Sequence, residues 1–102
     1  MDLLIDDIRD FNVDVIARNG KSGKAMLLSQ EWDTVYFDHD LGDRINGYEL
    51  LTFALESGLL NKSRVEIVTG NPVGRKNMEA ALKDSGFVEV HLSPYNTHWE
   101  LL

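Results

Sequence analysis

Two short acidic clusters carry the residue types that metal and proton chemistry require. Asp6-Asp7 and Asp38-His39-Asp40 each follow directly on an apolar segment with the composition of a buried strand. Carboxylates placed there lose hydration, which costs free energy, so such clusters indicate a functional site rather than a stabilising feature. Carboxylate oxygens are the ligands that Mg²⁺ prefers, and an imidazole can exchange a proton near neutral pH.

Other polar residues could hold a phosphate group. Thr69, Gly70 and Asn71 lie between a later apolar segment and a predicted helix. The first N–H groups of a helix have no partner within the helix, so they form an anion site. Arg9 follows the first acidic cluster, and Arg75 lies in the first turns of that helix. Together with the carboxylates, these groups are typical of Mg²⁺-assisted phosphate chemistry.

The elements that must position these residues alternate between strand and helix. Strands are predicted at residues 3–5, 13–17, 34–37, 65–68 and 88–92, and helices at about 22–30, 46–58 and 71–86. Such alternation predicts an α/β fold with a parallel sheet. The first and third strands are continuously apolar, as central strands are. We therefore predict a flavodoxin-like, doubly wound sheet of five strands in the order 2-1-3-4-5.

In that order, one edge of the sheet collects the polar residues. Ligands of doubly wound sheets bind at the carboxyl ends of the strands, where strands one and three lie side by side. This placement brings the two acidic clusters together, with Thr69 one strand away and Ser93 beyond it.

Two parts of the chain are too short for a full helix. The segment between the first two strands is shorter than an ordinary parallel crossover, so it is either a minimal helical turn or a hairpin. Residues 97–102 predict one capped turn, with His98 and Trp99 either packing on the core or forming a stacking platform for a base. The first and last helices are therefore expected to be reduced, and residues 1–102 to form one domain.

Capping residues indicate where the helices begin. Ser22 could cap the first helix, with Ala25, Leu28 and Trp32 on its buried side. Asn46 begins a capping-box pattern for the second. The glycine spacing of residues 20–24 is wrong for a phosphate-binding P-loop, so this segment is interpreted as a polar helix start.

Charge and composition narrow the classes of partner. The chain has 10 Lys and Arg residues against 17 Asp and Glu, a net charge of −7, so binding to extended duplex nucleic acid is not expected. It has no cysteine, which excludes disulfides and thiolate zinc ligands. No apolar run approaches the roughly 20 residues that span a bilayer, and the start lacks a signal-peptide pattern. We therefore expect a cytoplasmic protein without a membrane partner.

Several of these residues have simpler interpretations. An isolated Asp-Asp pair is often a solvated turn, Thr69 could be an ordinary hydroxyl at a strand end, and Arg75 could lie on a solvated helix face. His39 is a proton carrier, a metal ligand or a structural side chain hydrogen bonded to the backbone. The ordinary pKa of imidazole and the neighbouring oxygen ligands favour the first of these roles.

Motifs at three places of the sequence carry a family resemblance. They read Asp6-Asp7-Ile8-Arg9, Phe37-Asp38-His39-Asp40-Leu41-Gly42 and Asn71-Pro72-Val73-Gly74-Arg75-Lys76-Asn77-Met78. With them the chain resembles the response-regulator receiver domain, and more closely its offshoot, the cyclic-phosphate-processing receiver family, over about residues 3–86. The resemblance implies the 2-1-3-4-5 sheet, a Mg²⁺ site of acidic residues, and processing of cyclic phosphates on nucleotides, RNA ends or ADP-ribose-like products.

The sequence departs from receivers after the fifth strand. Receivers carry a lysine before a proline there, and in this chain Ser93 stands at that position, before Pro94. Because Ser93 cannot supply the charge that reads a phosphorylated aspartate, phospho-acceptance at Asp38 is the weakest of the hypotheses.

The favoured hypothesis is a Mg²⁺-dependent phosphoesterase acting on a small phosphorylated nucleotide or an RNA end. Asp6, Asp7 and Asp40 or Asp38 would hold the metal, Asp38 would be nucleophile or ligand, and His39 would protonate the leaving oxygen or activate water. The phosphate-binding residues would be Arg9, Thr69, Gly70, Asn71 and Arg75. The alternative is a catalytically inactive receiver-like module that binds a phosphorylated ligand or a partner protein. The small size would suit a phage or mobile-element protein.

Overall fold

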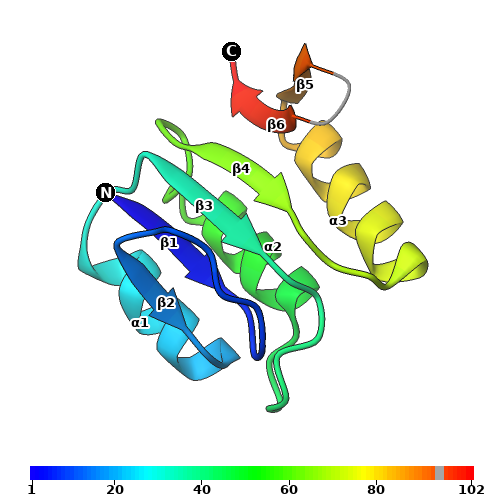
Figure 1. The fold of residues 1–102 in the computed structure, drawn as a ribbon. Coiled ribbons are helices and arrows are strands. Elements are labelled where there is room, and N and C mark those ends of the chain that lie inside the picture. The colour runs from blue at the N-terminus through cyan, green and yellow to red at the C-terminus, as the bar shows by residue number, and fades with distance from the viewer. Residues whose placement is uncertain (94–95) are drawn as a thin grey trace.

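A computed structural model describes residues 1–93 and 96–102 of the chain (Figure 1). The strands are β1 (Asp2–Ile5), β2 (Val15–Ala17), β3 (Thr34–Phe37), β4 (Arg64–Ile67), β5 (Phe87–Ser93) and β6 (Asn96–Leu101), and the helices are α1 (Gly20–Ser29), α2 (Gly47–Glu56) and α3 (Pro72–Asp84). In the described part of the chain, the strands form one sheet in the order β2-β1-β3-β4-β6-β5. The predicted receiver-like α/β fold is confirmed.

The parallel centre of the sheet is built as predicted. β1 lies between β2 and β3, and β4 follows β3, all in parallel pairs. Ile5 of β1 is in register with Phe37 of β3, and Phe37 with Ile67 of β4. Because these strands end level with one another, the residues that follow them emerge at one edge. The N–H of Asp38 donates to the carbonyl of Ile5 at 2.9 Å, which holds both strand ends together.

The predicted strand order and the predicted terminal turn are wrong at one side of the sheet. Residues 96–101 form β6, which is antiparallel to both neighbours and lies between β4 and β5. The physical reason is the burial of Trp99, which is 2% exposed and pairs in register with Val65 of β4. The expectation that His98 and Trp99 pack on the core is confirmed, since both are buried.

The first helix of a full receiver fold is absent, and the open question about the first connection is resolved. β1 and β2 are parallel, and residues 6–14 join them without a helix. The Phe11 ring of this connection packs edge-to-face on Tyr36 of β3, with 5.3 Å between the ring centroids. The connection therefore covers part of the sheet face that a helix covers in a doubly wound fold.

Helices α1, α2 and α3 lie in one layer on the other face (Figure 1), and α2 packs against both α1 and α3. The core beneath them uses alternate residues of the central strands: Leu3, Ile5, Val35, Phe37, Val65 and Ile67. No helix among the described residues is long and apolar enough to cross a bilayer.

Helix α1 differs from its prediction. It is capped by Asn19, whose side chain accepts from the N–H of Ser22 at 2.8 Å, so Ser22 is not the cap. Its buried residues include Gly23 and Leu27, whereas Ala25 and Leu28 are exposed. Gly23 determines which face of α1 is buried. It has no side chain, so the helix can approach β1 so closely that a Cβ at this position would lie 2.8 Å from Ile5 Cγ2.

The other helix starts agree with the sequence. Asn46 and Glu49 form the capping box of α2, and Asn71 caps α3 by accepting from the N–H of Gly74 at 3.0 Å. The polar start of α1 is not a phosphate loop, because the Asp43 carboxylate accepts from the N–H groups of Gly20 and Lys21, each at 3.1 Å. An internal carboxylate thus occupies the anion position at this helix end.

Candidate metal and phosphate site

Asp6 is the most deeply enclosed carboxylate of the site. It follows β1 directly and is 0% exposed. Its Oδ1 accepts from the backbone N–H groups of Ile8 at 3.0 Å and Arg9 at 2.9 Å, and its Oδ2 accepts from Arg9 Nη1 at 3.0 Å. Burial raises the pKa of Asp6, but the two backbone N–H groups and the guanidinium outweigh it, so the pKa lies below its usual value.

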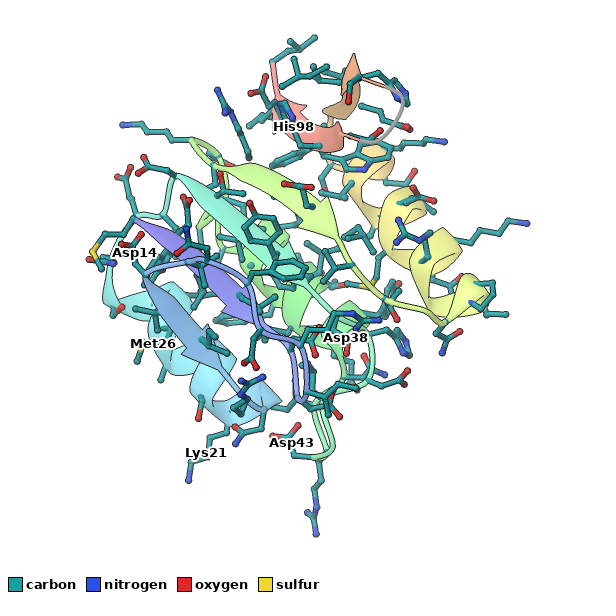
Figure 2. The ribbon with its side chains drawn as sticks, in the orientation of Figure 1. Asp14, Lys21, Met26, Asp38, Asp43 and His98 are labelled. Carbon is teal, nitrogen blue, oxygen red and sulfur yellow. The ribbon has the colours of Figure 1, made fainter. Side chains whose placement is uncertain are left out.

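Asp38 follows β3 (Figure 2) and is 4% exposed. One of its carboxylate oxygens lies within 4.8 Å of an oxygen of Asp6. Its Oδ1 accepts from the N–H of His39 at 2.8 Å, and its Oδ2 is 3.5 Å from Arg9 Nη1. Burial is the main cause that raises the pKa of Asp38, and the charge of Asp6 adds to it. A hydrogen bond from Thr69 acts against them.

The two buried carboxylates form a group with Asp7 that could hold a metal ion. Asp6, Asp7 and Asp38 each offer one oxygen, and these oxygens all lie within 4.8 Å of one another. Burial raises the pKa of Asp38, and a cation beside this carboxylate would favour its ionised form. A hard divalent cation such as Mg²⁺ fits this all-oxygen, charge-rich group.

Asp40 does not belong to this group. Its Oδ1 lies 3.1 Å from His39 Nδ1, and 68% of its side chain is exposed. The Nδ2 of Asn71 lies 3.5 Å from the same ring nitrogen, a weaker contact, so Nδ1 is best assigned as donating its proton to Asp40. This assignment leaves Nε2 of His39 as the nitrogen that can accept a proton.

His39 packs directly on the start of α3. A Cβ at Gly74 would lie 2.5 Å from His39 Cγ, so the imidazole occupies the space that a larger residue would need. The asparagine cap of α3 contacts the same ring, which links the 38–40 cluster to the segment after β4. Asn71 and Gly74 belong to the N-P-V-G segment of the sequence. Only the structure shows that both of them contact the His39 ring.

Replacing Gly74 by Ala is expected to displace the imidazole, because the added Cβ would lie 2.5 Å from His39 Cγ. Ala favours the helix by about 1 kcal/mol relative to Gly, which offsets part of the cost of moving the ring, so stability should change little. The ring signals of His39 in NMR spectra would measure the displacement, with exposed Lys76→Ala as the control. Unchanged ring signals would contradict the packing role of Gly74.

Four of the predicted phosphate-binding residues follow β4, whereas the fifth, Arg9, pairs with the carboxylates. Thr69 is buried, and its hydroxyl accepts from the N–H of Asn71 at 3.1 Å. Arg75 Nη2 donates to the Thr69 carbonyl at 3.3 Å, so this guanidinium lies at the same edge. A Cβ at Gly70 would lie 3.8 Å from Arg9 Nη2, which places Gly70 near the guanidinium of Arg9.

The start of α3 offers less to an anion than the sequence predicts. Pro72 has no N–H, the N–H of Gly74 is bound to the Asn71 side chain, and that of Arg75 to the Asn71 carbonyl. Positive charge at this edge therefore comes from the side chains of Arg9 and Arg75 more than from helix amides.

Ser93 lies farther from Asp38 than the predicted order implies. The insertion of β6 places one more strand between β4 and the end of β5, about 5 Å of extra separation. Ser93 is exposed, and Pro94 lies outside the described residues. The position that carries the receiver lysine is therefore removed from the carboxylates, which argues against phospho-acceptance at Asp38.

Sequence reasoning missed two residues that support the site. Arg18, just after β2, donates from Nη1 to the carbonyls of Arg9 at 2.7 Å and Asp6 at 3.4 Å, and its Nη2 pairs with Asp10. Gly47 lies so close to β3 that a Cβ there would overlap the Asp38 carbonyl, and its N–H donates to the His39 carbonyl at 2.7 Å. The Asn46-Gly47 pair in the sequence could have indicated the role of Gly47. Nothing in the sequence indicates the role of Arg18.

Replacing Arg18 by Gln is expected to loosen residues 6–10 and to weaken Mn²⁺ binding about tenfold, the effect of losing about one net hydrogen bond at the loop that carries Asp6. Faster amide exchange in residues 6–10 and a Mn²⁺ titration would show it. Arg64→Gln, which removes an equal charge paired with Glu100 on β6, serves as the control. Equal Mn²⁺ affinity in both variants would argue against this support.

Comparison with known proteins places the site in context. A family model described as the cyclic-phosphate processing receiver domain matches residues 1–84. That range contains the acidic clusters and all of α3, and it ends before the β5–β6 hairpin where the sheet order departs from prediction. Neither the curated proteins nor the solved structures provided a match.

Proposed function

Because the chain belongs to the cyclic-phosphate processing receiver domain family, we propose that it is a Mg²⁺-dependent phosphoesterase that opens a cyclic phosphate. Its substrate would be a small phosphorylated nucleotide, an RNA end or an ADP-ribose-type product. The observation that carries the proposal is that oxygens of Asp6, Asp7 and Asp38 lie within 4.8 Å of one another at the edge that also holds the His39–Asp40 pair.

The metal ligands of the proposed enzyme are three carboxylates. Asp6, Asp7 and Asp38 would hold the cation, which supplies charge neutralisation at the phosphoryl oxygens. Both oxygens of Asp38 already face donors, His39 N–H and Arg9 Nη1, and the side chain is buried. These contacts favour Asp38 as a ligand over Asp38 as the nucleophile.

Water is then the nucleophile, and His39 is its base. Asp40 holds the imidazole with its proton on Nδ1, so that Nε2 can take a proton from the attacking water. The water oxygen forms a bond to phosphorus, and one of the two ester P–O bonds of the ring breaks. The released sugar oxygen takes a proton from solvent, His39 returns its proton to solvent, and a phosphomonoester is the product.

Incubation with Mg²⁺ and a panel of 2′,3′-cyclic nucleotides and ADP-ribose cyclic phosphate tests the proposal, with ³¹P NMR detecting the monoester. We expect turnover of at least one substrate, loss of turnover with EDTA, and full activity in His91→Ala, which removes an exposed histidine of β5. Tight, stoichiometric binding without product for every substrate would overturn the enzyme and favour a binding module.

A further inference from the structure

Arg9 bridges the two buried carboxylates of the candidate metal site. Its Nη1 lies 3.0 Å from Asp6 Oδ2 and 3.5 Å from Asp38 Oδ2. We propose that Arg9 serves as the cation of the metal-free site, and that an entering divalent cation displaces its guanidinium toward the phosphate. The inference rests on the metal site of the proposed function and adds a coupling between metal and phosphate binding.

The guanidinium and a divalent cation compete for the same oxygens. A Mg²⁺ ion requires carboxylate oxygens at about 2.0–2.1 Å in near-octahedral geometry. Arg9 Nη1 now faces Oδ2 of Asp6 and Oδ2 of Asp38, the two buried members of the group. Two positive groups within a few ångströms of each other repel, so the cation binds fully only when the arginine moves.

Arg9 is built so that its side chain can move while its backbone stays. Its N–H donates to Asp6 Oδ1 at 2.9 Å, and its carbonyl accepts from Arg18 Nη1 at 2.7 Å. The side chain, by contrast, is 36% exposed. Release of the guanidinium from the carboxylates therefore need not disturb the main chain that positions Asp6.

The structure also indicates where the released guanidinium goes. Gly70 has no side chain to obstruct the guanidinium. The nearest atom to a Cβ built at Gly70 would be Arg9 Nη2 itself, at 3.8 Å. Thr69 precedes Gly70 in the chain, and its carbonyl accepts a hydrogen bond from the Arg75 guanidinium. Arg9 thus has free space on the side where the phosphate would bind, next to a second arginine.

Such an exchange makes the two ligands cooperative. Without metal, Arg9 is engaged with Asp6 and Asp38 and is a poor phosphate ligand. With metal, Arg9 is free to bind phosphate, so each ligand raises the affinity for the other by the same factor.

Titration of the protein with Mn²⁺, followed by EPR with and without saturating inorganic phosphate, tests the inference. Wild type should bind Mn²⁺ at least about fivefold more tightly with phosphate, the low end of ordinary coupling. In Arg9→Gln, Mn²⁺ alone should bind more tightly than to wild type. Phosphate should raise the Mn²⁺ affinity of this variant less than that of wild type, because only direct contact between the metal and phosphate would remain. Arg44→Gln, which removes an exposed charge from the loop before α2, controls for net charge.

Weaker Mn²⁺ binding by Arg9→Gln, or coupling as large in this variant as in wild type, overturns the exchange while leaving the metal site intact. Absence of Mn²⁺ binding in both proteins overturns the inference and the metal site together. Absence of turnover with the exchange intact overturns only the proposed hydrolysis.

A second measurement on wild type does not depend on a variant that folds. In ¹H–¹⁵N spectra, Mg²⁺ should shift the Nε–H signal of Arg9 and leave that of Arg18 in place. A stationary Arg9 signal at saturating Mg²⁺ overturns the exchange.

Discussion

Replacing His39 by Gln should lower kcat for cyclic-phosphate opening by about 10²–10⁴-fold, the usual contribution of one positioned general base. Glutamine can hydrogen bond but cannot take up the proton of water. Divalent-cation affinity should stay unchanged, because His39 contacts Asp40 and Asn71 and lies outside the Asp6, Asp7 and Asp38 group. Measurement of kcat at saturating Mg²⁺, together with a Mn²⁺ titration, separates the two effects.

The matched control is His91→Gln. His91 lies on β5, pairs with Glu89 and is exposed, so the same substitution there should leave kcat unchanged. A His39→Gln protein with wild-type kcat would show that the imidazole is structural. A large loss of Mn²⁺ affinity in His39→Gln would instead assign it to the metal.

Replacing Asp38 by Asn should abolish turnover. It should also weaken Mn²⁺ binding by at least about tenfold, or about 1.4 kcal/mol of binding free energy, because a buried carboxylate ligand is lost. The metal-free protein should at the same time become more stable. Burial and the charge of Asp6 raise the folded-state pKa of Asp38, so its ionised form is less favourable in the folded than in the unfolded chain at neutral pH. The neutral amide lacks that penalty, and urea unfolding without metal should show a gain in stability.

Asp40→Asn is the informative comparison for Asp38→Asn. If Asp40 serves His39, this variant should keep Mn²⁺ affinity and lose kcat. If Asp40 ligates the metal, both should fall. An Asp38→Asn protein that is less stable without metal would contradict the effect of buried charge at this position.

Much of the central fold could be predicted because the signals are local. The apolar segments of β1 and β3 and the asparagine caps of α2 and α3 form where the sequence indicates. Each depends on residues a few positions apart, so neighbouring side chains and backbone groups decide it. Alternation of strand and helix then leads to a parallel centre, since crossovers of that length join parallel strands.

The far side of the sheet could not be predicted in the same way. Residues 96–101 alternate in polarity, which is compatible with a turn or with a strand in several places. Insertion of β6 between β4 and β5 depends on the burial of Trp99 against a residue 34 positions earlier, Val65. Such a choice compares alternative packings of the whole chain, and no short segment contains that information.

The sequence by itself determined which strand ends lie side by side, because the carboxyl ends of parallel strands emerge at one edge of a sheet. Asp6, Asp38, His39 and Thr69 therefore meet where the order of elements requires. Only the tertiary structure decided their partners: Asp40 pairs with the imidazole, and Arg9 bridges the two buried carboxylates. These pairings depend on loop geometry and on Arg18, and differences of an ångström in position decide which charges compensate each other.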